Sequence, residues 1–318
     1  MDNSLKETAQ IEVVRLGKRR SLRADVTSWP VIIGFLLPAL LLYAFFVIYP
    51  ISQSIRYSFY DWNGLEPLTQ WVGLENFTNA FSDPLFLEAI RHNFIIIFLS
   101  LLLQIPFALA MALLLSRNLI GRGVFRVMFF APYILSDVVT GVVWRQIYRP
   151  GGLLDQLIAW FGIGSATHEW LADPKIALYS LFFVISWRFF GFHMVLMLAG
   201  LQLIPTDLEE AAAVDGATFW QSLRHITLPL LGPTIRVSVF LSIIGALQLF
   251  DLVWVTTKGG PVNSTATMAT YLVDWGFRRS QFGYASAVSV IVFGLSLIVA
   301  LLYQRFVLSR DLEGTITS

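Results

Sequence analysis

The sequence contains no cysteine and is poor in charge. Asp, Glu, Lys and Arg make up 14% of its 318 residues, against about 25% in a typical soluble domain. Without cysteine the chain forms no disulfide and no thiolate metal site, and its net charge of +1 gives no indication of nucleic-acid binding. Apolar residues are in excess, at 56% of the chain. The composition therefore indicates a membrane protein rather than a water-soluble one.

The apolar residues form six runs of about 20 residues, the length that a helix needs to cross a hydrocarbon core about 30 Å thick. The runs cover 29–49, 94–115, 127–147, 176–201, 235–255 and 284–306. We therefore expect an all-α, polytopic membrane protein with six transmembrane helices. No small-residue cleavage site follows the first run, so we expect it to be a retained helix rather than a signal peptide.

The distribution of Lys and Arg predicts which side of the membrane each segment faces, because positive residues stay in the cytoplasm during insertion. Segment 1–28 carries six of them and segment 116–126 carries three. We therefore expect one transmembrane domain, 29–308, between a cytoplasmic N-terminal segment, 1–28, and a cytoplasmic tail, 309–318. Segment 256–283 also carries three positive residues but falls outside by the order of the spans, so it is an exception to the rule.

The loop between the fourth and fifth runs, 205–230, is acidic where a cytoplasmic loop is usually basic. Thr206 followed by Glu209 has the spacing of a capping box, in which the hydroxyl and the carboxylate satisfy amides at a helix start. We therefore expect a helix from Asp207, rich in alanine and with acids in its first turn. Gly216 is expected to end it.

A second short helix is predicted directly after the first. Thr218 and Gln221 form another capping box, and Pro229 is expected to stop the helix. This helix carries Phe219 and Trp220, which a small loop cannot bury against itself. The two helices form an elbow that suits the groove of a partner protein. The alternative is an amphipathic hairpin packed on its own helix bundle.

The pattern Glu210-Ala211-Ala212, three residues, Gly216, nine residues, Ile226-Thr-Leu228-Pro229 resembles the EAA loop of binding-protein-dependent ABC importers. The resemblance implies a permease subunit whose loop is the coupling helix, seated in a cleft of the ATP-hydrolysing subunit. The residues to which it gives this role are Glu210, Ala211, Ala212, Asp215, Gly216, Phe219, Ile226, Leu228 and Pro229.

Further motifs resemble the carbohydrate-uptake permeases, of the maltose and glycerol-phosphate type. They are Leu198–Pro205, Phe250-Asp251, Thr257–Pro261 and Gly283–Ala287. The resemblance implies as partners a second permease, two ATPase subunits, a periplasmic or lipid-tethered sugar-binding protein, the sugar and membrane lipid. No Walker sequence occurs in the chain. We therefore expect a transporter subunit rather than an enzyme, with no cofactor of its own and with ATP and Mg bound by the ATPases.

Charged residues inside the apolar runs are expected to have a structural or functional role, since inserting each one at mid-bilayer costs about 2.5–3.5 kcal/mol. One possibility is an internal ion pair of Arg188 with Asp137 or Asp251. The resemblance also implies a sugar site in the membrane, formed by Tyr133, Asp137, Arg188, Phe189, Ser242, Gln248 and Leu249. Its chemistry would be hydrogen bonds to hydroxyls and aromatic faces against the ring.

Ala246 and Leu249 stand where the maltose importer uses asparagines, so the sugar is not identified. Arg188 suits an anionic group on the substrate as well as a structural pair, and His193 is expected to be a packed core residue.

The alternative function is an ion-coupled secondary transporter with Asp137 or Asp251 as the ion site, but it leaves the EAA-like loop unexplained.

Overall fold

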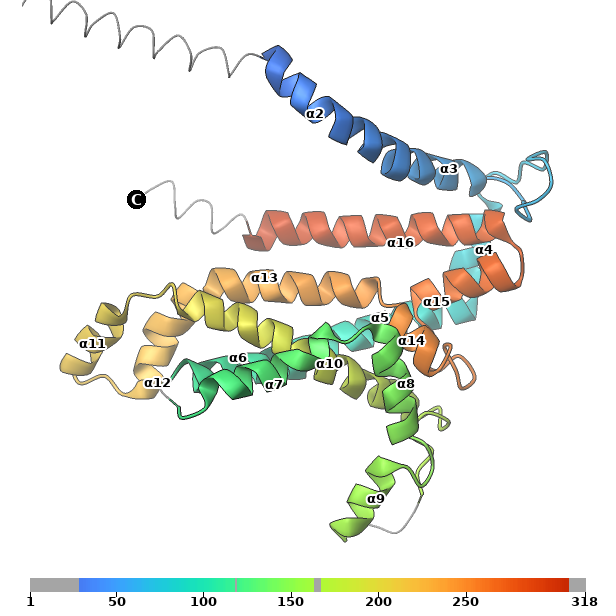
Figure 1. Ribbon diagram of the computed structural model, residues 1–318. Helices are drawn as coiled ribbons and strands as arrows, with labels where there is room; N and C mark the ends of the chain where they lie inside the picture. Colours follow the sequence, from blue (N-terminus) through green and yellow to red (C-terminus); the bar gives the residue numbers. More distant parts are fainter. Residues whose placement is uncertain (1–28, 118, 163–166, 309–318) are drawn as a thin grey trace, which may run out of the picture. The chain divides into compact units, whose positions relative to one another are not determined.

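The computed structural model describes residues 29–117, 119–162 and 167–308, and its contacts divide the chain into two compact units, 1–56 and 57–318. The regular secondary structure of the described residues is helical, apart from one isolated bridge between Tyr60 and Trp71 (Figure 1). Within this described part of the chain, five helices are long and apolar enough to cross a membrane, and the number is six if one pair of helices, bent by 100°, is counted as a single broken span. The expected all-α fold is confirmed. The predicted terminal segments, 1–28 and 309–318, lie outside the described residues.

The first unit is built on a single helical rod. It consists of α2 (Trp29–Tyr43), the π-helical segment η1 (Ala44–Ile48) and nearly all of α3 (Tyr49–Tyr57). The sequence predicts an end at Tyr49, before a proline, but the helix continues through Pro50. A π-helical turn tolerates the missing proline N–H because it shifts the hydrogen-bond register just before it.

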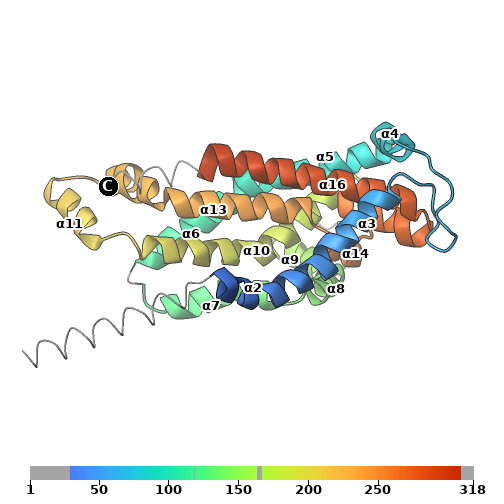
Figure 2. The same ribbon diagram turned by 90° about the horizontal axis from the view of Figure 1, so that it is seen from above.

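The second unit contains the remaining spans. The second span begins at Asp83, whose carboxylate accepts the Leu85 N–H at 2.8 Å, and follows the short helix α4 (Glu75–Ser82). The second span comprises α5 (Pro84–Leu99), η2 (Ser100–Gln104) and α6 (Ile105–Ser116); the fourth is α10 (Ala177–Leu201); the fifth comprises α12 (Phe219–Ser222), η3 (Leu223–Thr227) and α13 (Leu228–Leu247); the sixth comprises α16 (Phe282–Tyr303) and η5 (Gln304–Leu308). Helices α10, α13 and α16 run side by side in both ribbon views (Figures 1 and 2).

The third span is broken, which the sequence analysis did not predict. It consists of α7 (Arg122–Ile134) and α8 (Asp137–Ile147), bent by 100° with respect to each other. Pro132 cannot donate to the α7 ladder, Leu135 and Ser136 are extended, and the Ser136 hydroxyl accepts the Val139 N–H at 3.2 Å to start α8. The apolar run is therefore continuous in sequence but not in space.

The fifth span also differs from its prediction, because its helix ends at Leu247 rather than near Val255. The following residues form a separate short helix, α14 (Asp251–Thr256), which packs against α8. The two helices approach closely at Gly141, where an added Cβ would lie 2.8 Å from a methyl carbon of Val255. The broken third span and α14 thus form one packed unit.

Helix α10 lies at the centre of the bundle and packs against α6, α7 and α13. It is the most buried of the candidate spans. At Gly191 an added Cβ would lie 1.9 Å from the backbone oxygen of Phe129, and at Gly200 it would meet Thr234 at 2.5 Å. Small residues allow this approach of helices in a membrane. One end of this bundle carries α11 (Thr206–Val214), which lies beside α12 (Figure 1). The short helices α9 (Leu153–Trp160) and α15 (Met268–Val273) lie toward the other end (Figure 1). The π-helical segment η4 (Asp274–Arg278) follows α15 directly in the chain.

Candidate coupling loop and membrane cavity

The turn between α11 and α12 is formed by a left-handed glycine. Gly216 has a φ of +82°. Its N–H donates to the Ala213 carbonyl at 3.1 Å, and the Ala217 N–H donates to the Ala212 carbonyl at 2.9 Å. This pair of bonds is a Schellman motif, in which glycine is favoured because it has no Cβ. The prediction that Gly216 ends the first helix of the elbow is confirmed.

The start of α11 differs from the prediction. The helix begins at Thr206 with Pro205 as its N-cap residue, and the Thr206–Glu209 capping box is not formed. Pro205 has φ −60° and ψ 129°, which sets the entry of the chain without a side-chain cap. The Glu209 carboxylate instead accepts the hydroxyl of Thr227 at 3.0 Å. It ties α11 to the base of the fifth span.

The second helix of the elbow is the beginning of the fifth span rather than a separate element. Thr218 donates its N–H to the Gln221 side chain at 2.7 Å, as the predicted capping box requires. Pro229 does not stop the helix, however, because it lies in the first turn of α13 directly after the π-helical segment η3. The wide turn accommodates the missing N–H. A rotation of the elbow would therefore act directly on the fifth span.

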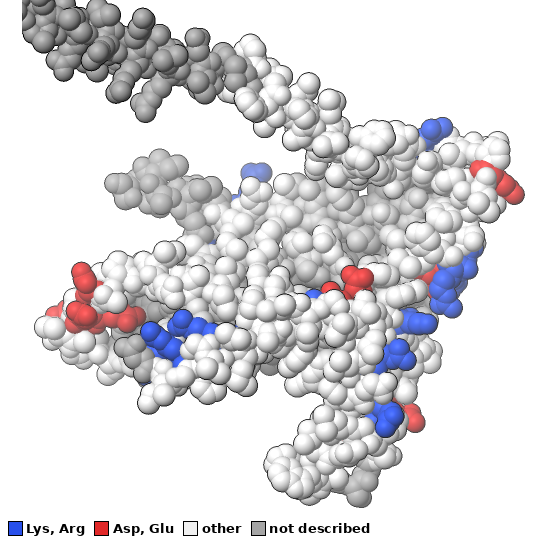
Figure 3. Space-filling model, viewed as in Figure 1, with Lys and Arg blue, Asp and Glu red and all other residues white. Residues whose placement is uncertain are grey.

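The elbow presents an exposed surface that is apolar in part and acidic in part. Val214 is 88% exposed and Trp220 is 73% exposed, while Phe219 lies with its ring 4.4 Å from the guanidinium carbon of Arg117. Acidic side chains gather at the end occupied by α11 (Figure 3). Of the predicted coupling residues, Glu210, Ala211, Asp215, Gly216, Phe219 and Pro229 are exposed, and Ala212, Ile226 and Leu228 are partly buried.

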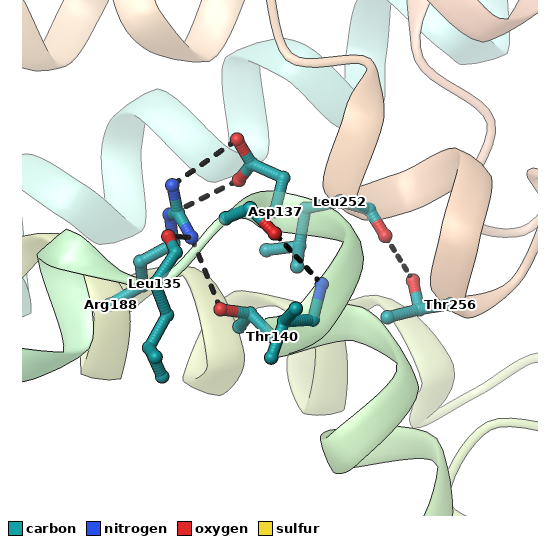
Figure 4. A network of polar contacts seen from close by, with 8 residues as sticks. Leu135, Asp137, Thr140, Arg188, Leu252 and Thr256 are labelled. Carbon is teal, nitrogen blue, oxygen red and sulfur yellow. Dashed lines mark hydrogen bonds and ion pairs between the residues drawn. The ribbon is translucent and has the colours of Figure 1, made fainter.

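The break of the third span is held by a buried arginine from the fourth (Figure 4). Arg188, 7% exposed, forms an ion pair with Asp137 at 3.1 Å and donates to the Thr140 hydroxyl at 3.1 Å. It also donates to the carbonyl of Leu135. Leu135 lies in the extended break, so its carbonyl is outside the hydrogen-bond ladder of either helix. Of the two predicted ion pairs the structure contains Arg188 with Asp137, and Asp251 lies exposed at the start of α14.

A cavity of about 240 Å³ lies between four spans. It brings together four of the seven predicted substrate residues: Tyr133, Phe189 and Ser242 from the third, fourth and fifth spans, and Leu249 just after the fifth. The rings of Tyr133 and Phe192 are stacked with their centroids 4.9 Å apart. The other three predicted residues, Asp137, Arg188 and Gln248, do not line it. Gln248 is an exposed residue at the C-cap of α13.

The sequence analysis missed the wall of the cavity that the second span supplies. Ser100 and Gln104 line the cavity from this span. The available signal was their spacing of four residues in the otherwise apolar run 94–115, which places both on one helix face. His193 borders the cavity but is 3% exposed, with its Nδ1 2.7 Å from the Ser238 hydroxyl, in agreement with its prediction as a packed residue.

The loop around α9 is organised by one carboxylate. Asp155 accepts the Trp170 indole N–H at 2.8 Å, the Gly151 N–H at 2.8 Å and the His168 N–H at 3.3 Å. The hydrogen bond from Trp170 lowers the pKa of Asp155 from its usual range, and the two backbone N–H groups lower it further. All of these groups favour the ionised form.

Acid is therefore expected to loosen this loop. Because the pKa of Asp155 is lower in the folded chain than in the unfolded one, its contribution is present above the unfolded value, about 3.9, and is lost as pH falls through the folded value. The chain has no cysteine, so an Ala159→Cys variant carries a single nitroxide label on α9. We expect the label to become more mobile below about pH 4, and Asp155→Asn to make it mobile already at pH 7. Asp173→Asn, in the same loop, is the control. Equal mobility at pH 7 and pH 3 would contradict this account.

Comparison with known proteins identifies the family. A family model described as the inner membrane component of binding-protein-dependent transport systems matches residues 104–310, which is most of the chain. The chain belongs to this permease family. The permease is 36% identical over 276 residues to a probable ABC transporter permease protein of Pyrococcus horikoshii, which covers 86% of this chain and 94% of that protein.

Two relatives of the permease carry more specific names. The lactose transport system permease protein LacF of Rhizobium radiobacter is 32% identical over 295 residues, 90% of this chain and 95% of the relative. The diacetylchitobiose uptake system permease protein NgcF of Streptomyces coelicolor is 32% identical over 297 residues, 90% of this chain and 84% of the relative. A solved bacterial ABC transporter for import of the acidic polysaccharide alginate has the same fold, with a TM-score of 0.77, 23% identity and coverage of 90% of this chain and 97% of that chain.

These matches confirm the predicted family. The chain is a multi-pass inner-membrane permease subunit of a binding-protein-dependent ABC importer, and such a subunit does not itself hydrolyse ATP. The ion-coupled secondary transporter is therefore rejected as the alternative. The roles of individual residues in the coupling loop and in the cavity remain predictions.

Proposed function

We propose that this permease and a second permease subunit form the membrane path of an ATP-driven sugar importer. The observation that carries the proposal is the elbow of α11 and α12, whose exposed apolar side chains are continuous with a membrane-spanning helix. Such a surface needs a partner. Two ATPase subunits, each holding one permease elbow in a cleft, supply that partner. They also bind the ATP and Mg that this chain has no motif to bind.

The choice of a sugar rests on the named relatives and on the cavity. Relatives named for lactose and for diacetylchitobiose transport are each 32% identical over 90% of the chain. The cavity combines aromatic rings, such as those of Tyr133 and Phe189, with hydroxyl-bearing side chains such as Ser242. Aromatic faces pack on the CH groups of a sugar ring, and polar side chains bind its hydroxyls.

In the proposed mechanism a periplasmic or lipid-tethered binding protein delivers the sugar to the outer face. Both termini and the coupling loop, 205–230, lie in the cytoplasm. The ATPases change their separation on binding ATP, and the elbow moves with the cleft that holds it. A nucleotide can shift the permease between inward-open and outward-open states only through contacts that differ between those states.

The residues of the elbow have distinct parts in this mechanism. Glu210 is exposed and pairs with a basic group of the ATPase, and Asp215 adds to the same acidic surface. Gly216 permits the turn. Glu209 transmits motion through its hydrogen bond to Thr227 at the base of the fifth span. The path from the ATPase to the cavity is then short, because α13 carries both the end of the elbow and Ser242.

Uptake by reconstituted vesicles tests the proposal. The complete complex, with its binding protein, is expected to accumulate at least one of a panel of sugars when ATP is enclosed with the ATPases, and to stop when the binding protein is left out. An uncoupler should not change the rate. Uptake that needs an ion gradient, or no ATP-dependent uptake of any sugar, would overturn the proposed function.

A further inference from the structure

Four uncharged polar groups converge on the membrane cavity without any partner from the chain. They are the hydroxyls of Ser100, Tyr133 and Ser242 and the side-chain amide of Gln104. None of the four makes a side-chain hydrogen bond within the part of the chain that the structure describes. Ser100 is 3% exposed and Gln104 is 4% exposed. None of the four polar groups is enclosed by protein atoms, so each is open to hydrogen bonding with a ligand that enters the cavity.

The backbone of the second span is locally distorted where two of these groups stand. Ser100 and Gln104 are the first and last residues of the π-helical segment η2, and the Ile105 N–H donates to the Ser100 carbonyl. π-Helical turns inside α-helices are frequent at functional sites. Pro106 follows directly in α6, so the wide turn relieves the missing N–H of the proline and sets both polar side chains into the cavity.

The lining of the cavity carries no full charge. Within the described residues, no Lys, Arg, Asp or Glu contributes to it. The nearby guanidinium of Arg188 is engaged by Asp137, Thr140 and the carbonyl of Leu135. An anionic sugar would therefore lose its water without gaining a counter-charge, which is costly in a membrane interior. Uncharged hydroxyls match the amide and hydroxyl groups that are present.

We propose that Ser100 and Gln104 of the second span bind hydroxyls of an uncharged sugar ring, which lies in the cavity against Tyr133 and Phe189. This inference rests on the proposed function and adds a substrate class and two specificity residues to it. The amide of Gln104 can both donate and accept, as a sugar hydroxyl does.

The test measures sugar imported per ATP hydrolysed by the complete reconstituted complex, with saturating sugar-loaded binding protein. The panel contains uncharged mono- and disaccharides, lactose and diacetylchitobiose among them, and alginate pentasaccharide as the acidic probe. Wild type is expected to import an uncharged sugar. Gln104→Leu and Ser100→Ala should each lower the amount imported per ATP by roughly threefold to tenfold, the effect of one lost hydrogen bond.

Ser186→Ala is the matched control, since the Ser186 hydroxyl of α10 is buried without a partner in the described chain but does not line the cavity. A merely structural defect lowers ATPase stimulation and import together, whereas loss of a sugar contact lowers import at unchanged stimulation. Preferential import of alginate pentasaccharide, or unchanged import per ATP in both cavity variants, overturns the inference and leaves the importer intact. No ATP-dependent import of any sugar overturns the proposed function itself.

Discussion

Gly216→Pro is expected to abolish ATP-driven uptake while the membrane spans remain folded. Gly216 has a φ of +82°, and its N–H bonds the Ala213 carbonyl. Proline fixes φ near −65° and has no N–H, so the Schellman turn cannot form, at a cost of about 3 kcal/mol or more. We expect at least about a tenfold loss of uptake, since 1.4 kcal/mol corresponds to a factor of ten. Uptake in vesicles and co-purification of the ATPase subunit measure the effect.

Milder substitutions at the same position give a graded series. No heavy atom lies within 4 Å of the Cβ site at Gly216, so alanine meets only backbone strain, about 1–2 kcal/mol, and asparagine tolerates the left-handed conformation. Uptake should therefore be highest in Gly216→Asn, lower in Gly216→Ala and lowest in Gly216→Pro. Gly121→Ala is the control, because Gly121 has a φ of +79° in a different loop. If Gly216→Pro assembled and imported sugar like the wild type, the proposal that this elbow couples the ATPase to the permease would be wrong.

Arg188→Ala is expected to destabilise the permease strongly and to reduce uptake of the uncharged sugar with it. The substitution leaves the carboxylate of Asp137 and the carbonyl of Leu135 without their partner in the membrane. Breaking a fully buried ion pair from one side costs about 3–5 kcal/mol, and the loss here should be smaller because the Asp137 side chain is 30% exposed. Arg188→Lys should also fail in large part, since an ammonium cannot reproduce the planar fork that reaches several acceptors at once. Thermal unfolding of the purified complex and uptake in vesicles measure both effects.

A double variant separates the structural role from a substrate role. Arg188→Met combined with Asp137→Leu removes both charges, and replacing a buried pair by apolar residues is often neutral. We expect this variant to regain part of the stability lost in Arg188→Ala. Arg145→Ala on α8 is the control, because Arg145 is exposed and makes only a 3.4 Å contact with the Val255 carbonyl. A selective loss of acidic-sugar uptake in Arg188→Ala would show instead that the guanidinium binds the substrate.

The spans and the elbow could be predicted because their signals are local. The fourth span was expected over 176–201 and is observed over Ala177–Leu201, since apolar length alone decides whether a helix can cross a bilayer. The turn at Gly216 follows from the conformational freedom of one residue. The break after Ile134 was missed although Pro132 and Ser136 signal it, because hydropathy averaged over a run does not register a change of direction.

By itself the sequence determined that this chain is a helical membrane protein with six long apolar runs and an EAA-like elbow, because helix length, polarity and glycine conformation depend on neighbours along the chain. The tertiary structure alone decided which polar residues meet. Ser100 and Tyr133 border the same cavity from different spans, and Arg188 turns away from it to hold the break beside Asp137. The physical reason is that a polar group in a bilayer pairs with whichever partner the packing of the helices brings within hydrogen-bond distance. That packing depends on residues far apart in the chain, so no local sequence pattern predicts it.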